Sequence, residues 1–368
     1  MIVTIKYKLK PNKTTINKFN HWINCCRFLY NAALEERISN YKGAGKSISK
    51  YEQYNELPEL KKDLPFMAEV YSDVLQEVLD RIDKSYKNFF NGSGFPKFQK
   101  KANYNSFTFK RSIRIVGNNK NYIKLPKIGL VKFHNSKNID NDSIKTATIV
   151  REKNKWFVAV TYKVQEPSTT IDNSNAIGID VGVVNHSTLS NGKVYSSNKY
   201  LENNLPVLRR LQRKLSRQKK GSNSYLKTKH QLGKLHLKIS NQRKDYNHKI
   251  SKEITDTYSA VYVEDLKISN MVKLNSTLSR RMLDNGLFQF RTFLSYKCKL
   301  KGKYFHAVNP AYTSQQCSDC GVIDKKSRIS QSEYVCTSCG FLSNSDCSAA
   351  INIKAKGISF STKSKALA

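Results

Sequence analysis

The chain has 368 residues, of which 39% are hydrophobic, and this length is sufficient for two or three hydrophobic cores. Its 64 Lys and Arg against 28 Asp and Glu give a formal net charge of +36. Such an excess repels itself in the folded state unless a polyanion neutralises it. No apolar run approaches the ~18 residues that span a membrane, so the composition favours nucleic acid over a membrane as the partner.

The first part of the chain predicts a β-unit with a helical unit inserted into it. Alternating apolar residues from Val3 to Leu9 predict a strand that Pro11 ends, and this beginning does not resemble a signal peptide. From Thr14 to about Asn91 the apolar residues recur at helical spacing. Further short strands are predicted at residues 106–109, 122–125, 130–133, 146–149 and 156–160. The simplest arrangement is that the N-terminal strand completes the sheet formed by these later strands.

The second part of the chain begins after residues 167–175, which are rich in Ser, Thr, Asp and Asn and resemble a linker. Residues 176–184 predict a strand in which Gly178, Asp180 and Gly182 share one face. Two glycines leave bare backbone on either side of the carboxylate. We expect this to make room for a bulky anion such as a phosphodiester. The alternative is an ordinary strand with an aspartate at its edge.

Two long basic helices are predicted between Leu205 and Thr257, joined around residues 221–224. From Arg209 to Lys252 there are fifteen Lys and Arg and a single acid. A charge run is usually a solvated face, but this excess is better explained by a phosphate backbone that lies along it. The candidate nucleic-acid-binding residues are Arg209, Arg213, Arg217, Lys219, Lys220, Arg243 and Lys244.

Two pairs of cysteines predict a metal site. Cys317 and Cys320 form one Cys-x-x-Cys pair, Cys336 and Cys339 form the other, and fifteen residues separate the pairs. This is the spacing of a tetrathiolate zinc ribbon. Four thiolates would occupy all four coordination positions of a tetrahedral zinc ion and leave none open for catalysis, so the zinc is predicted to be structural. A disulfide or chance clustering is the alternative, and eight cysteines in all suit a reducing cytoplasm.

Three carboxylates predict a catalytic site. Asp180 lies on the strand described above, and Glu264 ends a short apolar run where α/β sheets usually place their sites. Asp346 precedes an alanine-rich helix, where an N-cap role is the alternative. Clustered carboxylates repel one another without cations, and Mg²⁺ prefers oxygen ligands. Two Mg²⁺ ions roughly 3.5–4 Å apart would activate water and stabilise the leaving oxygen of a phosphodiester, which is the RNase H-like nuclease layout.

Further motifs occur along the chain together with these residues, in the order found in a known protein family. They are Cys25-Cys-Arg-Phe-Leu-Tyr-Asn31, Leu79-Asp-Arg-Ile-Asp83 with Phe89-Phe90, Gly94-Phe-Pro-Lys-Phe98, Gly178-Ile-Asp-Val-Gly182, Leu215-Ser-Arg217 with Lys220-Gly-Ser222, Arg243-Lys-Asp-Tyr-Asn-His-Lys-Ile-Ser251, Val263-Glu-Asp-Leu266, Tyr312-Thr-Ser-Gln315 and the two cysteine pairs. In this order the chain resembles the TnpB family, the RNA-guided nucleases that bacterial and archaeal transposons encode. These are related to the compact type V CRISPR effectors.

The resemblance implies an α/β multidomain protein in which an RNase H-like (RuvC) nuclease domain carries an inserted zinc ribbon, preceded by a β-barrel-like wedge domain that a helical recognition lobe interrupts. The implied domains are the wedge at residues 1–12 and 104–167, the recognition lobe at residues 13–103, the RuvC-like domain at residues 176–311 and 341–357, the zinc ribbon at residues 312–340 and a tail at residues 358–368. Asp180, Glu264 and Asp346 match the family's metal-binding acids. One departure concerns the last acid, where the family usually has Arg-Asp-x-Asn-Ala-Ala and this chain has Ser345-Asp-Cys-Ser348. The missing Arg and Asn remove a cation and an amide, which predicts slower cleavage or a degenerating copy.

The function implied is that of an RNA-guided, Mg²⁺-dependent DNA endonuclease with structural Zn²⁺ and a single RuvC-like site. The expected partners are a guide RNA from the element's own 3′ end and a double-stranded DNA target with a short flanking motif. A monomeric prokaryotic protein of the cytoplasm and nucleoid is expected, without a membrane. An RNA-guided repressor that cuts weakly or not at all is the alternative, although the intact acids argue against it. A plain zinc-ribbon RNA-binding protein leaves those acids unexplained.

Overall fold

The computed structural model describes residues 1–368 except 118–120, 138, 154, 267–275, 331 and 367–368. The chain forms two compact units, Met1–Gln165 and Glu166–Ala368, and each is described by itself. In the described parts of both units, no helix is long and apolar enough to cross a bilayer. The finer division into five domains stays a prediction.

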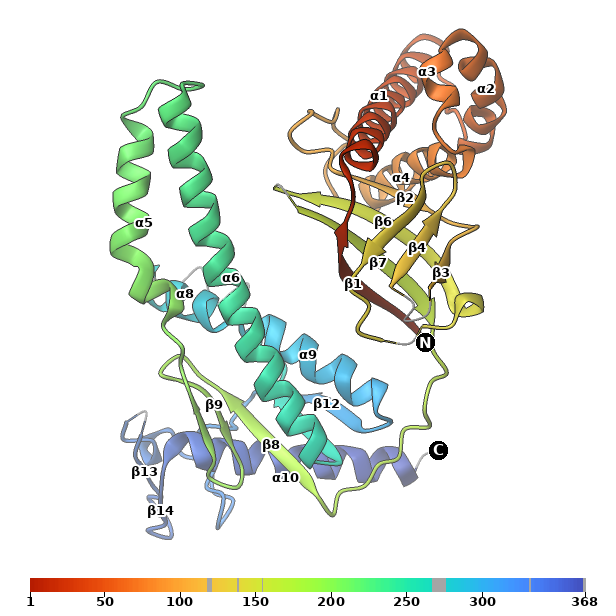
Figure 1. The fold of residues 1–368 in the computed structure, drawn as a ribbon. Coiled ribbons are helices and arrows are strands. Elements are labelled where there is room, and N and C mark those ends of the chain that lie inside the picture. The colour runs from red at the N-terminus through yellow and green to blue at the C-terminus, as the bar shows by residue number, and fades with distance from the viewer. Residues whose placement is uncertain (118–120, 138, 154, 267–275, 331, 367–368) are drawn as a thin grey trace. The chain divides into compact units, whose positions relative to one another are not determined.

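The first unit contains an antiparallel sheet with strand order β2-β6-β7-β1-β5-β4-β3 (Figure 1). Its strands are β1 (Ile2–Lys10), β2 (Ser106–Phe109), β3 (Arg114–Val116), β4 (Tyr122–Leu125), β5 (Gly129–Phe133), β6 (Ile144–Glu152) and β7 (Lys155–Lys163). Tyr7 pairs with Val158 of β7, and Leu9 pairs with Phe133 of β5. The N-terminal strand therefore completes the sheet, as predicted. No strand pair in the described residues joins β2 to β3, so hydrogen bonds do not close the predicted barrel.

The helices of the first unit lie in the chain between β1 and β2. They are α1 (Lys13–Ala44), α2 (Lys50–Asp63), α3 (Pro65–Ala68) and α4 (Ser72–Phe90). The Asn12 side chain caps α1 by accepting a hydrogen bond from the Thr15 amide at 2.8 Å. The Trp22 ring of α1 lies 5.5 Å from the Phe107 ring of β2. The inserted helices and the sheet thus share one hydrophobic core.

The second unit is built on a mixed sheet with strand order β10-β9-β8-β11-β12 (Figure 1). Its strands are β8 (Ala176–Val181), β9 (Asn185–Leu189), β10 (Val194–Ser196), β11 (Ala260–Glu264) and β12 (Tyr304–Val308). The central pair β8 and β11 is parallel, and Ile179 pairs with Val263. The side chains of Ile179 and Val263 pack with Phe290 in the core on one face of the sheet. Tyr262 packs in a second core on the opposite face.

The second unit also contains helices, three of which pack on the two faces of the sheet. The helices are α5 (Tyr200–Ser216), α6 (Asn223–Thr257), α8 (Ser276–Asn285), α9 (Leu287–Leu300) and α10 (Ser345–Ala366). Ile250 of α6 and Phe290 of α9 pack on one face, and Ile353 of α10 packs on the other. Helices α5 and α6 form the predicted basic hairpin. Residues 358–366, which the sequence assigns to a tail, continue α10 without a break.

Candidate functional site

Asp180 and Glu264 lie side by side at the carboxyl ends of the two central strands. Because Ile179 pairs with Val263 in the parallel ladder, the next residue of each strand turns to the opposite face. That face is the one against which α10 packs. Asp346 is the second residue of α10. The fold thus brings three acids from distant parts of the sequence to one face of the sheet.

The three carboxylates interact electrostatically. Burial, followed by repulsion from Glu264 and Asp346, raises the pKa of Asp180 to about 7. Asp180 still keeps part of its surface open to solvent, although protein atoms surround it densely. Burial also raises the pKa of Glu264, against the opposing hydrogen bond from the Thr313 hydroxyl. Such a cluster destabilises the fold unless a cation joins it.

Asp346 does not cap its own helix. The Asn344 side-chain oxygen accepts hydrogen bonds from the Asp346 amide at 3.0 Å and from the Cys347 amide at 3.2 Å, so Asn344 is the capping residue. The interpretation of Asp346 as an N-cap is therefore wrong. Its buried carboxylate is directed to other partners, at 7% exposure.

A cation and an amide do stand beside Asp346, and the sequence patterns indicated neither. Arg328 Nη2 lies 3.7 Å from Asp346 Oδ1, and Asn185 Nδ2 donates to Asp346 Oδ2 at 3.5 Å. The positive charge of Arg328 also opposes the rise that burial causes in the pKa values of Asp180 and Glu264. These two side chains supply the groups whose loss from positions 345 and 348 suggested a weakened site.

The oxygen atoms of the three carboxylates do not all lie within 4.8 Å of one another. In the described ranges, only the four paired cysteines form a group of three or more potential ligands whose atoms all lie within 4.8 Å of one another. The acids are spread more widely than this. That spacing suits Mg²⁺, which usually keeps several waters and takes phosphate oxygens of the substrate as further ligands.

The glycines beside Asp180 have a different role from the one predicted. A Cβ on Gly178 would collide with the Ala350 carbonyl oxygen and would lie 2.6 Å from the Lys354 nitrogen. A Cβ on Gly182 would lie 2.9 Å from the Asn185 carbonyl oxygen. The prediction that these glycines clear space for a phosphodiester is wrong, because protein backbone occupies that space. Gly178 instead lets α10, and with it Asp346, approach the sheet closely.

The four paired cysteines are positioned to hold one metal ion. The Sγ atoms of Cys317 and Cys339 are 3.8 Å apart, and those of Cys320 and Cys336 are 3.6 Å apart. A tetrahedral zinc with Zn–S bonds of about 2.3 Å places its sulfurs about 3.8 Å apart. A disulfide needs about 2.05 Å, so the arrangement fits a zinc tetrathiolate and not a disulfide.

Backbone amides donate hydrogen bonds to two of these sulfurs, those of Cys317 and Cys336. The Asp319 amide donates to Cys317 Sγ at 3.4 Å, and the Cys339 amide donates to Cys336 Sγ at 3.5 Å. Hydrogen bonds from the Cys339 and Ser338 amides lower the pKa of the Cys336 thiol to about 6. The glycines that follow the pairs, Gly321 and Gly340, have φ of +79° and +73°, a conformation that glycine adopts without strain.

The basic hairpin exposes most of its predicted contacts. Arg209, Arg213, Arg217, Lys219, Lys220 and Lys244 are all exposed. Arg213 and Arg217 line an open groove along α5 together with Arg210 and Lys214. Arg243 differs, since it is partly buried and its guanidinium donates to the Leu283 carbonyl. We therefore assign Arg243 a structural contact in addition to its predicted one.

The groove on α5 gives a prediction for salt dependence. Replacing Arg213, Arg217 and Lys220 with Ala should make the plot of log affinity against log salt visibly shallower, by about 0.7–0.9 for each phosphate that is no longer neutralised. Titrations of single-stranded nucleic acid at several salt concentrations measure this slope. Replacing Lys42, Lys46 and Lys62 removes the same charge from the other unit and should change the slope less. An equal effect of both triple variants would mean that the hairpin is only a solvated surface.

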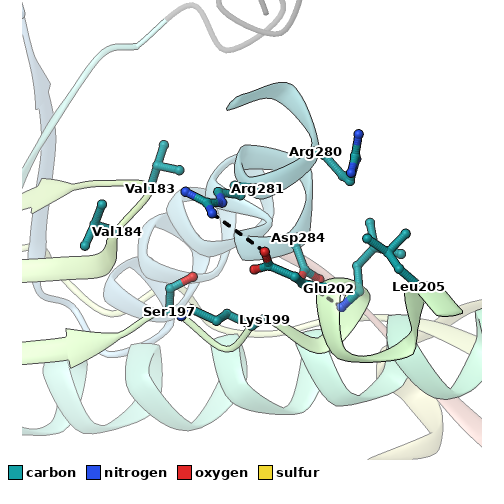
Figure 2. A pocket seen from close by; sticks show the side chains of 10 residues that line it. Val183, Val184, Ser197, Lys199, Glu202, Leu205, Arg280, Arg281 and Asp284 are labelled. Carbon is teal, nitrogen blue, oxygen red and sulfur yellow. Dashed lines mark hydrogen bonds and ion pairs between the residues drawn. The ribbon is translucent and has the colours of Figure 1, made fainter. Parts of the chain in front are cut away.

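A cavity of about 130 Å³ lies at the base of this hairpin and does not include the three acids (Figure 2). Arg281 of α8 pairs with Glu202 of α5 at 3.6 Å across it. Asp284 Oδ2 accepts from the Leu201 amide at 2.8 Å and so stabilises the beginning of α5. These contacts hold the hairpin to α8.

Comparison with known proteins places the chain in a family. Family models described as a probable transposase, a Cas12f1-like TNB domain and a helix-turn-helix domain match residues 159–275, 288–353 and 1–46. Residues 1–46 here contain β1 and α1. The chain is 32% identical to the "Putative RNA-guided DNA endonuclease InsQ" of Escherichia coli (strain K12), over 96% of this chain and 91% of that protein. The chain belongs to the TnpB family.

Other relatives agree with this placement. The TnpB-family chain is 28% identical to a "Putative RNA-guided DNA endonuclease" of Streptomyces pristinaespiralis, over 97% of this chain and 89% of that protein. Its fold resembles a chain in the cryo-EM structure of the Cas12f1-sgRNA-target DNA complex, with a TM-score of 0.59 and 16% identity. The match covers 93% of this chain and 83% of that one. Together with the matched TNB domain, it relates this mixed α/β protein to the compact type V effectors.

Proposed function

We propose that this protein is an RNA-guided DNA endonuclease in which Asp180, Glu264 and Asp346 hold Mg²⁺ at a single RuvC-like site. The observation that carries the proposal is the largely buried Asp180 at the end of β8, which interacts with Glu264 at the end of β11 and with Asp346 in the first turn of α10. The names of the two relatives describe the same activity. The strand order, with three antiparallel strands followed by two parallel ones, supports the RNase H-like assignment.

The protein's own side chains prepare this site for phosphodiester hydrolysis. Bound Mg²⁺ would supply activation of water and neutralisation of the leaving oxygen. The Thr313 hydroxyl donates to Glu264 and fixes its carboxylate, and Asn185 does the same for Asp346. The Arg328 guanidinium places a fixed positive charge beside the acids, where charge develops on the phosphate in the transition state.

Recognition of the target DNA is shared between the guide RNA and the protein. The guide RNA pairs with one DNA strand and thereby reads sequence, while the protein holds backbones and reads a short flanking duplex. The exposed basic residues of the α5–α6 hairpin suit the backbone contacts. The sgRNA and target DNA in the Cas12f1 complex support such partners. We further propose that the guide comes from the element's own 3′ end, that the protein acts as a monomer and that the paired cysteines hold structural zinc.

The test is to sequence the RNA that copurifies with the protein expressed together with its flanking DNA. We expect one discrete RNA transcribed from beside the 3′ end of the gene. With that RNA and Mg²⁺, the protein should cut a plasmid that carries the complementary target beside a library of flanking sequences. Binding of the target without any cutting would favour the repressor. A heterogeneous RNA population would favour generic RNA binding.

A further inference from the structure

The end of α4 and the loop that follows it carry four phenylalanines, Phe89, Phe90, Phe95 and Phe98, which we call the phenylalanine cluster. Phe90 is 78% exposed, Phe98 is 53% exposed and Phe95 is 46% exposed. The Phe89 ring lies 5.4 Å from the Phe90 ring and 5.3 Å from the Phe95 ring. Neighbouring exposed aromatic rings mark an interaction surface, because a soluble protein normally keeps such apolar area from water.

Contacts with α1 and α4 fix the backbone of the loop at Gln99 and the ring of Phe95. The Asn31 side chain of α1 donates to the Gln99 carbonyl at 3.1 Å and accepts from the Gln99 amide at 2.7 Å. Pro96 is buried. The Phe95 ring packs edge-on against the Tyr86 ring of α4 at 5.7 Å. The cluster is therefore presented by an anchored loop, and a partner that covers it does not need to order it first.

The lysines around the phenylalanine cluster favour a partner that carries negative charge. Residues 84–101 contain five lysines and neither Asp nor Glu. The lysines, all exposed, are Lys84, Lys87, Lys97, Lys100 and Lys101. A second copy of this chain would bring the same positive charge and be repelled. A ligand that combines anionic groups with flat aromatic ones satisfies both the lysines and the rings, and single-stranded nucleic acid is such a ligand.

We propose that the phenylalanine cluster is a stacking platform for unpaired bases of RNA. Proteins recognise RNA mainly at loops and ends, where unstacked bases lie on aromatic side chains. A resident RNA also covers the rings throughout the life of the protein, whereas a passing DNA substrate leaves them in water between encounters. The inference rests on the proposed function in taking the bound RNA to be a guide that stays on the protein.

The test compares the full-length protein with its Phe90→Ala and Phe98→Ala variants and with the double variant. The probes are a 20-nucleotide oligoadenylate RNA, an abasic RNA of the same length and the matching DNA, followed by fluorescence anisotropy. Each stack that is removed should weaken binding of oligoadenylate RNA about fivefold or more, with an unchanged salt dependence. Binding of the abasic RNA should not change. Phe288→Ala, which removes a 70% exposed ring from the other unit, is the matched control.

Three results would overturn the proposal. The first is an unchanged affinity of the double variant for oligoadenylate RNA while its thermal unfolding matches the wild type. The second is an equal or larger loss on DNA, which would assign the rings to a DNA strand. The third is a concentration-dependent dimer that the same substitutions dissolve. Loss of RNA binding in a protein that never cuts DNA would refute the nuclease and leave the stacking platform standing.

Discussion

Asp180→Ala should abolish target cleavage, by orders of magnitude, while binding of guide RNA and target DNA stays close to that of the wild type. The substitution removes a ligand from the centre of the acid cluster, and with it both water activation and charge neutralisation. It leaves the exposed hairpin of α5 and α6 unchanged, and this hairpin carries the predicted phosphate contacts. Cleavage of a plasmid target in Mg²⁺ and an electrophoretic binding assay measure the two effects separately.

Asp265→Ala is the matched control for this prediction. Asp265 follows Glu264 in the chain, but its carboxylate pairs with Arg291 of α9 at 2.5 Å, on the other face of the sheet. We expect this variant to retain most of the wild-type cleavage rate. An Asp180→Ala protein that cuts as fast as the wild type would show that the site lies elsewhere.

Protein stability gives a second readout of the same site. Burial and repulsion raise the pKa of Asp180 to about 7. Ionisation of this carboxyl therefore reduces the free energy of unfolding. The reduction reaches its full size once the pH is above that pKa. At pH 8 without divalent ions, Asp180→Asn should therefore melt at or above the wild-type temperature. Added Mg²⁺ should raise the melting temperature of the wild type more than that of the variant. The opposite order would indicate a structural carboxylate.

Local sequence patterns predicted most strands of the first unit and, in the second unit, β8, β11 and the two basic helices. The strands at residues 106–109 and 122–125 were predicted at their observed limits, because alternation of apolar residues is a local property. The helix pair around residues 221–224 was found for the same reason. The three-residue strand β3 was missed, since Arg114–Val116 is too short to show a period, and β9, β10, β12, α8 and α9 of the second unit were not predicted either. The sequence also predicted one site formed by the three acids, and the parallel pairing of β8 with β11 puts Asp180 beside Glu264.

Contacts between distant segments could not be predicted in this way. Gly178 has an ordinary strand setting in sequence, and only the backbone of α10, more than 170 residues later, explains why a side chain is excluded there. Arg328 and Asn185 reach Asp346 from two distant parts of the chain, a loop of the ribbon and the start of β9, so the residues around Ser345 show only that the usual Arg and Asn are missing there. One local signal was available and not used. Asn344 is itself a favoured N-cap residue, and it precedes the helix directly.

Cys336→Ser should release zinc and loosen residues 310–345. The ribbon has a small core around Tyr334, so the metal supplies much of its folding free energy. Metal analysis should find about one zinc per wild-type chain and far less in the variant, and limited proteolysis should cut the variant within these residues. Cys347→Ser is the control, because this thiol lies outside the tetrathiolate group. Purified, folded wild type with well under one zinc would contradict the assignment.

The same substitution should also reduce cleavage strongly, although a tetrathiolate zinc has no open position for catalysis. The ribbon holds Arg328 beside Tyr334 through a β-bridge, two residues before Cys336, and directs its guanidinium to Asp346. Arg328→Ala separates the two effects: we expect it to keep its zinc and still to cut about 10- to 100-fold more slowly, as the loss of a side chain that supports a proposed metal ligand implies. Wild-type cleavage by Arg328→Ala would mean that the ribbon affects the acids only by supporting α10. Full cleavage by zinc-free Cys336→Ser would remove any coupling between the ribbon and the site.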